Sequence, residues 1–288
     1  MNRICVAVAL LAVPLILAAA PDSEKDVRGG DAGKLVFSWS RSQMNGSRTG
    51  VGCPGAENVR EAVGHVKGNV YFSPGGKIYR GGATAKAARI LIGAQPAMAQ
   101  VKEVVGYSPR PMVNAYPEST LSNWFIDNIM SAVEKASGKH VDVGIGNFGG
   151  IRVDMPEGDI LKDDIMSMFP FKNNIVYVAL KGKDVRAILD QMAATRFQVL
   201  GGVRVVASDG KVVSAEIGGE PLDDEKVYGV ATITFLLDGG DDLHVSRNAL
   251  EVTEYPVEIY DVMMDAVRND TAAGRPVEYR TDGRVQIR

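Results

Sequence analysis

Hydrophobic and polar positions follow two different patterns along this chain of 288 residues. From about residue 99 onward, apolar residues recur at the spacings of helices and strands. Residues 21–97 instead contain many glycine, serine, lysine and arginine residues and few periodic apolar stretches. We therefore predict a targeting segment at 1–20, a partly ordered lead at 21–97 and a packed domain at 98–288. Within the lead, short strands are expected near 35–38 and 69–72.

The packed domain mixes helical and strand-like patterns. Helices are predicted over 117–133, where Ser119 suits the N-cap, over 161–168, around 185–192, and from Pro256 to about 267. Strands are predicted at 101–107, 141–145, 174–179, 203–207, 211–217, 227–235, 277–279 and 284–287. Asp209 and Gly210 suit the tight turn of a hairpin. Because the order of elements has no regular βαβ rhythm, we predict an α+β fold with a mixed β-sheet and packed helices.

The first residues have the features of a secretory signal peptide. Residues 4–20 form an apolar run behind Arg3, interrupted by Pro14 and ending in small residues. This run is shorter than the roughly 20 residues that span a membrane. We therefore expect export to the periplasm or the extracellular space, with membrane contact only if the segment stays uncleaved as an anchor. Cys53 is then the only thiol of the mature chain, so no internal disulfide is expected.

Composition excludes several classes of function. The chain has 32 lysine and arginine residues against 35 aspartate and glutamate residues, which gives a net charge of −3. Without a basic excess to neutralise a phosphate backbone, no nucleic-acid partner is expected. The chain contains 3 histidines and 2 cysteines, which leaves little material for a metal site. We therefore expect no metal or other cofactor in this chain.

The run Asn-Phe-Gly-Gly-Ile-Arg at 147–152 follows a predicted buried strand and is the first candidate for binding chemistry. Gly149 and Gly150 allow a ligand to approach the backbone N–H groups closely. Arg152 offers a planar guanidinium group that suits a phosphate or a carboxylate. A tight strand exit with a surface arginine explains the same run equally well.

Two further runs combine an aromatic ring with a polar side chain. In Phe-Pro-Phe-Lys-Asn-Asn at 169–174, Phe171 could stack on a heterocycle while Asn173 bonds its edge. In Thr-Phe-Leu-Leu-Asp-Gly-Gly-Asp at 234–241, Phe235 could be a second stacking ring, and Asp241 could accept from a ribose hydroxyl. The alternatives are a helix end at Pro170 with two core aromatics, and a Gly-Gly turn capped by an aspartate.

Taken together, the three runs resemble the C-terminal domain of the 5′-nucleotidase family, which includes periplasmic UDP-sugar hydrolases. Supporting matches lie at 105–108, 118–123 and 197–202, and the resemblance covers roughly residues 98–288. It implies that Phe171 and Phe235 sandwich the base. It further implies that Asn173 and Asp241 make polar contacts to the nucleoside and that Arg152 binds the phosphate. From the 147–152 run itself, we add Asn147, Gly149 and Gly150 to the predicted substrate site. Further family arginines have no counterpart at 114–117.

Full-length members of that family also carry an N-terminal metallophosphoesterase domain with two metal ions. Its metal-binding motifs have no match at His65, His140 or His244, since Lys67 replaces the second histidine of the nearest run at 64–67. We therefore expect a nucleotide- or nucleoside-recognition domain, with no catalytic residues of its own. A separate metallophosphoesterase subunit would then hold the divalent metal and hydrolyse phosphoesters. A stand-alone nucleoside- or nucleotide-binding protein is the alternative, followed by a self-sufficient hydrolase with an unrecognised site.

Overall fold

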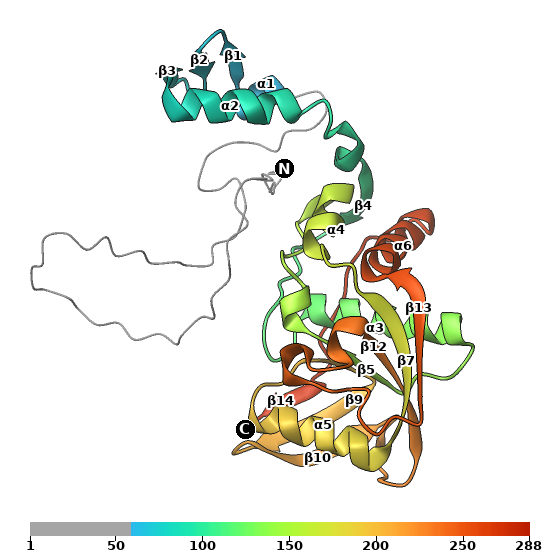
Figure 1. Ribbon diagram of the computed structural model, residues 1–288. Coiled ribbons are helices and arrows are strands. Elements are labelled where there is room, and N and C mark those ends of the chain that lie inside the picture. The colour runs from blue at the N-terminus through green and yellow to red at the C-terminus, as the bar shows by residue number, and fades with distance from the viewer. Residues whose placement is uncertain (1–58) are drawn as a thin grey trace, which may run out of the picture.

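The computed structural model describes residues 59–288 of the chain (Figure 1). The predicted targeting segment and the strand expected near 35–38 lie outside these residues. The described residues form a small unit of helices and short strands, followed by a larger body that contains two principal sheets. Among residues 59–288, no helix combines the length and the apolar character needed to span a membrane.

The small unit lies at one end of the molecule, apart from the larger sheets (Figure 1). Strands β1, β2 and β3 form an antiparallel sheet and α2 packs against it. The bounds are α1 Val59–Val63, β1 His65–Lys67, β2 Val70–Phe72, β3 Ile78–Arg80, α2 Gly82–Ala94 and η2 Ala99–Lys102. The strand expected near 69–72 is present as β2. Helix α2 was not predicted, because its inward positions are the alanines Ala85 and Ala88, whose small side chains make no clear apolar stripe.

A five-stranded mixed sheet forms the centre of the larger body, in the order β13-β7-β12-β5-β8. Strands β12 and β5 run parallel, and the other neighbours are antiparallel. Helix α3 packs against β5, β7, β8 and β12 (Figure 1). The bounds are α3 Thr120–Ser137, β5 Val143–Gly146, β7 Asn174–Lys181, β8 Val199–Gly201, β12 Val227–Ile233 and β13 Glu251–Glu258. This arrangement confirms the predicted α+β fold.

Helix α3 begins at the predicted cap and extends four residues beyond its predicted end, and it packs closely on a glycine of the sheet. Ser119 is the N-cap, with its Oγ accepting a hydrogen bond from the Ser122 N–H at 3.1 Å. Gly138 closes the helix with a left-handed φ of 67°. A Cβ atom at Gly144 of β5 would lie 2.6 Å from Cγ1 of Ile126 on α3. Glycine at this strand position therefore allows the buried face of α3 to approach the sheet.

A second sheet and three further helices complete the larger body. Its order is β11-β10-β9-β14, and a separate pair is formed by β4 and β6. The bounds are β4 Val104–Ser108, β6 Gly158–Leu161, α4 Lys162–Met168, α5 Gly182–Ala194, β9 Val203–Ser208, β10 Lys211–Ile217, β11 Glu220–Pro221, α6 Ile259–Ala272 and β14 Val285–Ile287. Asp209 and Gly210 both have positive φ, so the predicted hairpin turn between β9 and β10 is confirmed.

Several predicted elements differ from the structure. Pro256 lies inside β13, and α6 begins only at Ile259. Strand β13 is at the edge of its sheet and its register shifts between Tyr255 and Glu258, so the missing N–H of Pro256 breaks no ladder. Strand β12 ends at Ile233, which places Phe235 in the short helical turn η4 Thr234–Leu236. Residues 277–279 form no strand and make a backbone hydrogen bond from Val277 N to Tyr107 O at 2.8 Å.

Asp164 is a buried carboxyl group in the first turn of α4. Its Oδ2 accepts a hydrogen bond from the Leu161 N–H at 2.7 Å. Burial raises the pKa of Asp164 to about 6, although this hydrogen bond opposes the shift. Between the ordinary pKa of 3.8 and about 6, the folded chain binds more protons than the unfolded chain. The contribution of Asp164 to the free energy of unfolding therefore falls as the pH rises through this window.

Asp164→Asn is expected to remove that contribution, because the amide oxygen still accepts from Leu161 while the titrating group is gone. The pH-dependent difference between wild type and variant should reach roughly 3 kcal/mol across the window. Urea unfolding of both proteins between about pH 4 and about pH 7 measures it. Asp190→Asn, on the exposed side of α5, is the matched control. Parallel pH profiles for wild type and Asp164→Asn would contradict the prediction.

Candidate functional site

Strand order and direction bring the three predicted binding motifs to one edge of the five-stranded sheet. Strands β5 and β12 are parallel, with Val143 paired to Val230, so both end at the same edge. Strand β7 runs antiparallel to β12, with Ile175 paired to Ile233, so β7 begins at that edge. The segments that follow β5 and β12 and the segment that precedes β7 therefore meet there. These segments are 147–152, 234–241 and 169–174.

Direct contacts connect all three segments. The Asn147 Nδ2 atom donates a hydrogen bond of 2.8 Å to Oδ2 of Asp241. The Thr234 hydroxyl donates to Oδ1 of Asn173 at 3.3 Å. The guanidinium carbon of Arg152 lies 5.8 Å from the centre of the Phe171 ring. Each segment thus contacts the other two, and the arrangement is fixed by packing as well as by topology.

Asn147 is the buried polar centre of this edge, with 4 % of its surface exposed. Because its Nδ2 donates to the Asp241 carboxylate, the amide orientation is determined and Oδ1 points the other way. This Oδ1 atom has no hydrogen-bond partner within the described residues. Asn147 borders a narrow hollow of about 10 Å³ that Gly150, Phe171 and Asn173 also line. A buried acceptor without a donor costs about 1–3 kcal/mol, which a ligand hydroxyl or amine would recover.

The two phenylalanine rings predicted to stack on a base are both exposed. Phe171 is 46 % exposed and Phe235 is 45 % exposed. Within the described residues, neither ring stacks on another aromatic ring. Phe169 is buried and its ring centre lies 5.3 Å from that of Phe125. The core-packing interpretation of the 169–174 run is therefore right for Phe169 and wrong for Phe171.

The loop that carries Phe235 folds back on itself through its two glycines. A Cβ atom at Gly240 would lie 2.0 Å from the carbonyl oxygen of Phe235. Gly239 N donates to the Leu243 oxygen at 2.7 Å and closes the loop. Asp241 has a left-handed φ of 49°, a conformation that aspartate tolerates better than most residues. The loop thereby directs the Asp241 carboxylate toward Asn147 while the Phe235 ring stays at the surface.

The Arg152 guanidinium group is held at the same edge without a carboxylate partner among residues 59–288. Its Nη1 donates to the Gly149 oxygen at 3.1 Å, and the group lies over the Phe171 ring. These two contacts fix the group and leave other N–H donors available. Asn173 is similar, since its Oδ1 accepts from Thr234 while its Nδ2 makes no hydrogen bond within the described part of the chain. The edge therefore holds two buried acceptors without a partner among the described residues, Oδ1 of Asn147 and Oδ1 of Asn114, together with donors on Arg152 and Asn173.

Asn114 is a supporting residue that the sequence analysis missed. Its Nδ2 donates to the oxygens of Phe148 at 3.1 Å and Ile151 at 3.0 Å. These two bonds hold the glycine turn of 147–152 at both of its ends. Nothing in the local sequence marks Asn114 for this role, because its partner Phe148 is 34 residues away.

Gly150→Ala is expected to disturb the site, and Gly149→Ala is not. A Cβ atom at Gly150 would lie 2.6 Å from Oδ1 of Asn147, whose amide the bond to Asp241 holds in place. At Gly149 the nearest atom would be 3.5 Å away, an ordinary contact. The overpacked variant should lose about 1–3 kcal/mol of unfolding free energy. Urea unfolding of the two variants checks this, and equal stabilities would contradict it.

Metal-binding groups are not gathered in the described residues. Within residues 59–288, no group of three or more histidine, cysteine, aspartate or glutamate side chains could hold a metal ion. The His65 ring stacks on Phe72 with ring centres 4.7 Å apart, and His140 is exposed beside Glu134. His244 lies next to Gly239 in the Phe235 loop. The three histidines therefore serve different parts of the fold.

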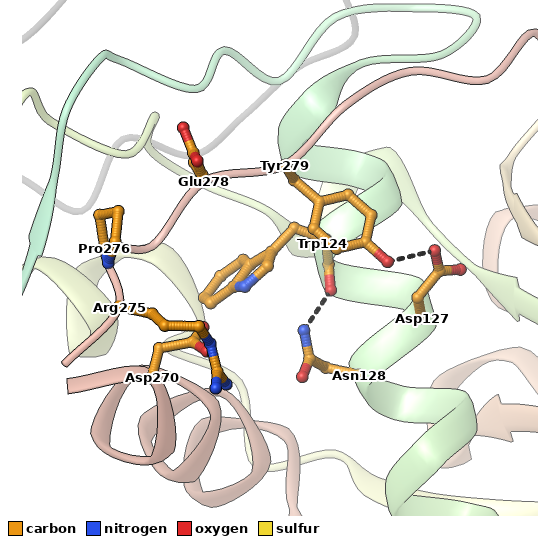
Figure 2. Close-up of a pocket in the computed structure, with 8 residues that line it drawn as sticks. All are labelled: Trp124, Asp127, Asn128, Asp270, Arg275, Pro276, Glu278 and Tyr279. Atoms are coloured by element: carbon orange, nitrogen blue, oxygen red, sulfur yellow. Dashed lines mark hydrogen bonds and ion pairs between the residues drawn. The ribbon is translucent and has the colours of Figure 1, made fainter. Parts of the chain in front are cut away.

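A separate hollow of about 390 Å³ lies between α3 and the C-terminal segment (Figure 2). It is lined by the buried ring of Trp124. Several of its polar groups already have partners: the Tyr279 hydroxyl donates to Asp127 at 2.7 Å, and Arg275 pairs with Asp270 at 2.8 Å. Burial, together with the hydrogen bond to Asp127, raises the pKa of Tyr279 well above its usual range. We interpret this hollow as the place where the C-terminal segment docks on α3.

Comparison with known proteins places the three motifs within one family domain. Residues 98–247 match the profile of the family described as 5′-nucleotidase, C-terminal domain. That match covers more than half of the chain and includes all three candidate motifs.

Among curated relatives, the protein UshA of Salmonella pullorum is 36 % identical over 105 residues, which cover 35 % of this chain and 19 % of that protein. An apyrase of Tabanus yao is 27 % identical over 169 residues, which cover 51 % of this chain and 30 % of that protein. Among solved structures, a 5′-nucleotidase precursor from Thermus thermophilus superimposes with a TM-score of 0.62 and 27 % identity, covering 71 % of this chain and 43 % of that one. The chain thus spans about a fifth of the length of the first of these relatives.

Proposed function

Because the chain belongs to the 5′-nucleotidase C-terminal domain family, we propose that it recognises nucleosides and nucleotides at the edge where β5, β7 and β12 meet. One observation carries this proposal more than any other. The buried Asn147 amide is bonded to Asp241 on one side and has an unpartnered acceptor on the other, between segments that each expose a phenylalanine ring. Such an arrangement suits a flat heterocycle that carries hydrogen-bond donors.

The base would be held by stacking. Phe171 and Phe235 stand on segments that flank Asn147, and both rings expose almost half of their surface. Stacking on an aromatic side chain contributes about 1–3 kcal/mol per base and tolerates different bases, since every base has a π face. Ring stacking alone therefore favours nucleosides as a class, while the polar groups beside the rings would discriminate among them.

The polar groups would hold the rest of the nucleotide. Asp241 has acceptor capacity beyond its bond to Asn147, which suits a ribose hydroxyl. Asn173 has an amide nitrogen without a partner among residues 59–288, which suits a base or sugar acceptor. The Arg152 guanidinium group suits the phosphate, because it has no carboxylate partner among the described residues and is already held by Gly149 and Phe171.

Hydrolysis would require a metallophosphoesterase partner, which we propose as a separate subunit that holds the divalent metal ions. The names of the relatives, apyrase and 5′-nucleotidase among them, support a role in nucleotide catabolism. The apolar run at 4–20 supports export, so both subunits would act outside the cytoplasm. The recognition domain would supply substrate binding and the partner would supply activated water.

Calorimetric titration of the purified protein tests the recognition step. Adenosine, AMP and a UDP-sugar are compared with ribose 5-phosphate, which has the sugar and phosphate but no base. We expect the three nucleosides and nucleotides to bind at least roughly tenfold more tightly than ribose 5-phosphate, because stacking supplies about 1–3 kcal/mol. Absence of binding for all three, or equal binding of ribose 5-phosphate, would contradict the proposal.

The partnership is tested separately. A purified metallophosphoesterase that lacks its own recognition domain is assayed for phosphate release from AMP with a divalent metal, with and without this protein. Addition of the protein should lower the KM for AMP. An unchanged KM and an unchanged rate, in samples where the titration does detect nucleotide binding, would leave a stand-alone binding protein as the function.

A further inference from the structure

We propose that Arg196 is a second phosphate-contacting residue of this site and makes it selective for nucleotides over nucleosides. The inference rests on the proposed nucleotide recognition and adds to it a residue from a different part of the chain. Arg196 lies between α5 and β8, outside the three motifs that form the edge. It belongs to none of the contacts described so far.

Two neighbouring segments hold Arg196 beside the glycine turn. Its guanidinium carbon lies 4.8 Å from the centre of the Tyr116 ring, and that ring meets Phe148 edge-on with centres 5.9 Å apart. Two residues further along the chain, Oε1 of Gln198 accepts a hydrogen bond from the Phe148 N–H at 3.2 Å. The segment at 196–198 and the segment that carries Tyr116 are thus both attached to Phe148, the residue directly before Gly149.

The charge of Arg196 is available to a ligand. The residue is exposed and forms no ion pair or side-chain hydrogen bond within residues 59–288. Its guanidinium group lies over the aromatic face of Tyr116, which orients the planar group and leaves its N–H edge free. Arg152 is held in the same way on Phe171. Two oriented guanidinium groups therefore accompany one turn, and each lacks a carboxylate partner in the described part of the chain.

The charge of the ligand favours more than one cation. A phosphate monoester carries about −1.5 to −2 charges at neutral pH, and Arg152 supplies a single positive charge. The carboxylate of Asp241 at the same edge adds to the negative charge that a bound phosphate meets. A second arginine beside the turn would offset more of this negative charge.

The test compares affinities for AMP and adenosine in Arg196→Met, Arg196→Lys and the wild type. Methionine keeps an apolar stem against Tyr116 and removes the charge, whereas lysine keeps the charge and removes the planar fork. We expect Arg196→Met to weaken AMP binding about tenfold more than adenosine binding, because charge-assisted hydrogen bonds are lost. The slope of log Kd for AMP against log salt concentration should become shallower. The AMP affinity of Arg196→Lys should lie between those of the wild type and Arg196→Met.

Arg204 is an exposed arginine on β9, and Arg204→Met is the matched control. It should change neither the ratio of AMP affinity to adenosine affinity nor the salt dependence of AMP binding. Equal weakening of AMP and adenosine in Arg196→Met would overturn the assignment and leave the residue as a support for Tyr116. No change in either affinity would also overturn it. If wild-type protein binds adenosine as tightly as AMP, this assignment fails while nucleoside recognition stands. If wild type binds neither, the proposed function itself fails.

Discussion

Replacing Arg284 with methionine is expected to lower the free energy of unfolding by about 3–5 kcal/mol, the cost of breaking a buried ion pair from one side. Arg284 is 7 % exposed and lies directly before β14. Its guanidinium group donates to both carboxylate oxygens of Asp127, at 2.8 and 3.0 Å, and to both of Asp282, at 3.0 and 2.8 Å. It also donates to the Leu200 oxygen at 3.2 Å.

The size of this effect follows from the two carboxylates, of Asp127 and Asp282, that would lose their partner. Burial lowers the pKa of Arg284, but the hydrogen bonds to Asp282 and Asp127 outweigh it and raise the pKa above its usual range. The bond to Arg284 in turn holds the pKa of Asp282 below its ordinary value. Without the guanidinium group, two carboxylates would face each other in a partly buried place. The C-terminal segment, which Tyr279 also attaches to Asp127 of α3, would lose the contacts that Arg284 makes to α3 (Figure 2).

Urea unfolding followed by circular dichroism measures this prediction. Arg275→Met is the matched control, because Arg275 forms an exposed ion pair with Asp270 at the same C-terminal segment. That pair should contribute less than about 1 kcal/mol. A second variant, Arg284→Met combined with Asp282→Asn, should recover part of the loss by removing one uncompensated charge. If Arg284→Met costs no more than Arg275→Met, the buried network does not stabilise the fold as argued.

Phe171→Ala and Phe235→Ala are each expected to weaken adenosine binding by roughly tenfold to a hundredfold. The reason is the loss of one stacking face at the proposed base site. Both rings are almost half exposed, so their removal should change the free energy of unfolding by only about 0.5 kcal/mol or less. The combined variant should bind no nucleoside at the concentrations that saturate the wild type.

The two variants should differ in their response to AMP. Phe171 also supports the Arg152 guanidinium group, which lies 5.8 Å from its ring centre. Phe171→Ala should therefore weaken AMP binding more than adenosine binding, whereas Phe235→Ala should weaken both alike. Tyr107→Ala, which removes an exposed ring on β4, is the control for loss of surface aromatic area. Calorimetry on the wild type, the two phenylalanine variants and Tyr107→Ala measures these affinities. Wild-type affinity in either phenylalanine variant would count against the sandwich of the base between the two rings.

Much of the fold follows from local pattern. The helical spacing at 117–133 and the Ser119 cap define α3 closely, because both depend on residues within a few turns of each other. The hairpin at 203–217 is equally local, since Asp209 and Gly210 adopt the positive φ that its turn requires. The predicted helix start at Pro256 is wrong because proline suits both the first turn of a helix and a bulge in an edge strand, so the local sequence does not distinguish them. The pairing of β13 with β7 decides between them, and β7 lies about 75 residues earlier in the chain.

Short runs of residues were enough to establish the class of fold, the family and the three segments of the candidate site, because motifs and periodicity are local properties of the chain. Long-range packing was needed to show that Phe169 enters the core while Phe171 faces solvent, and that Asn147 meets Asp241. It was also needed to bring Asn114 to the glycine turn and Arg196 to the ring of Tyr116. The physical reason is that such contacts depend on strand order and register, through which residues far apart in the chain become neighbours.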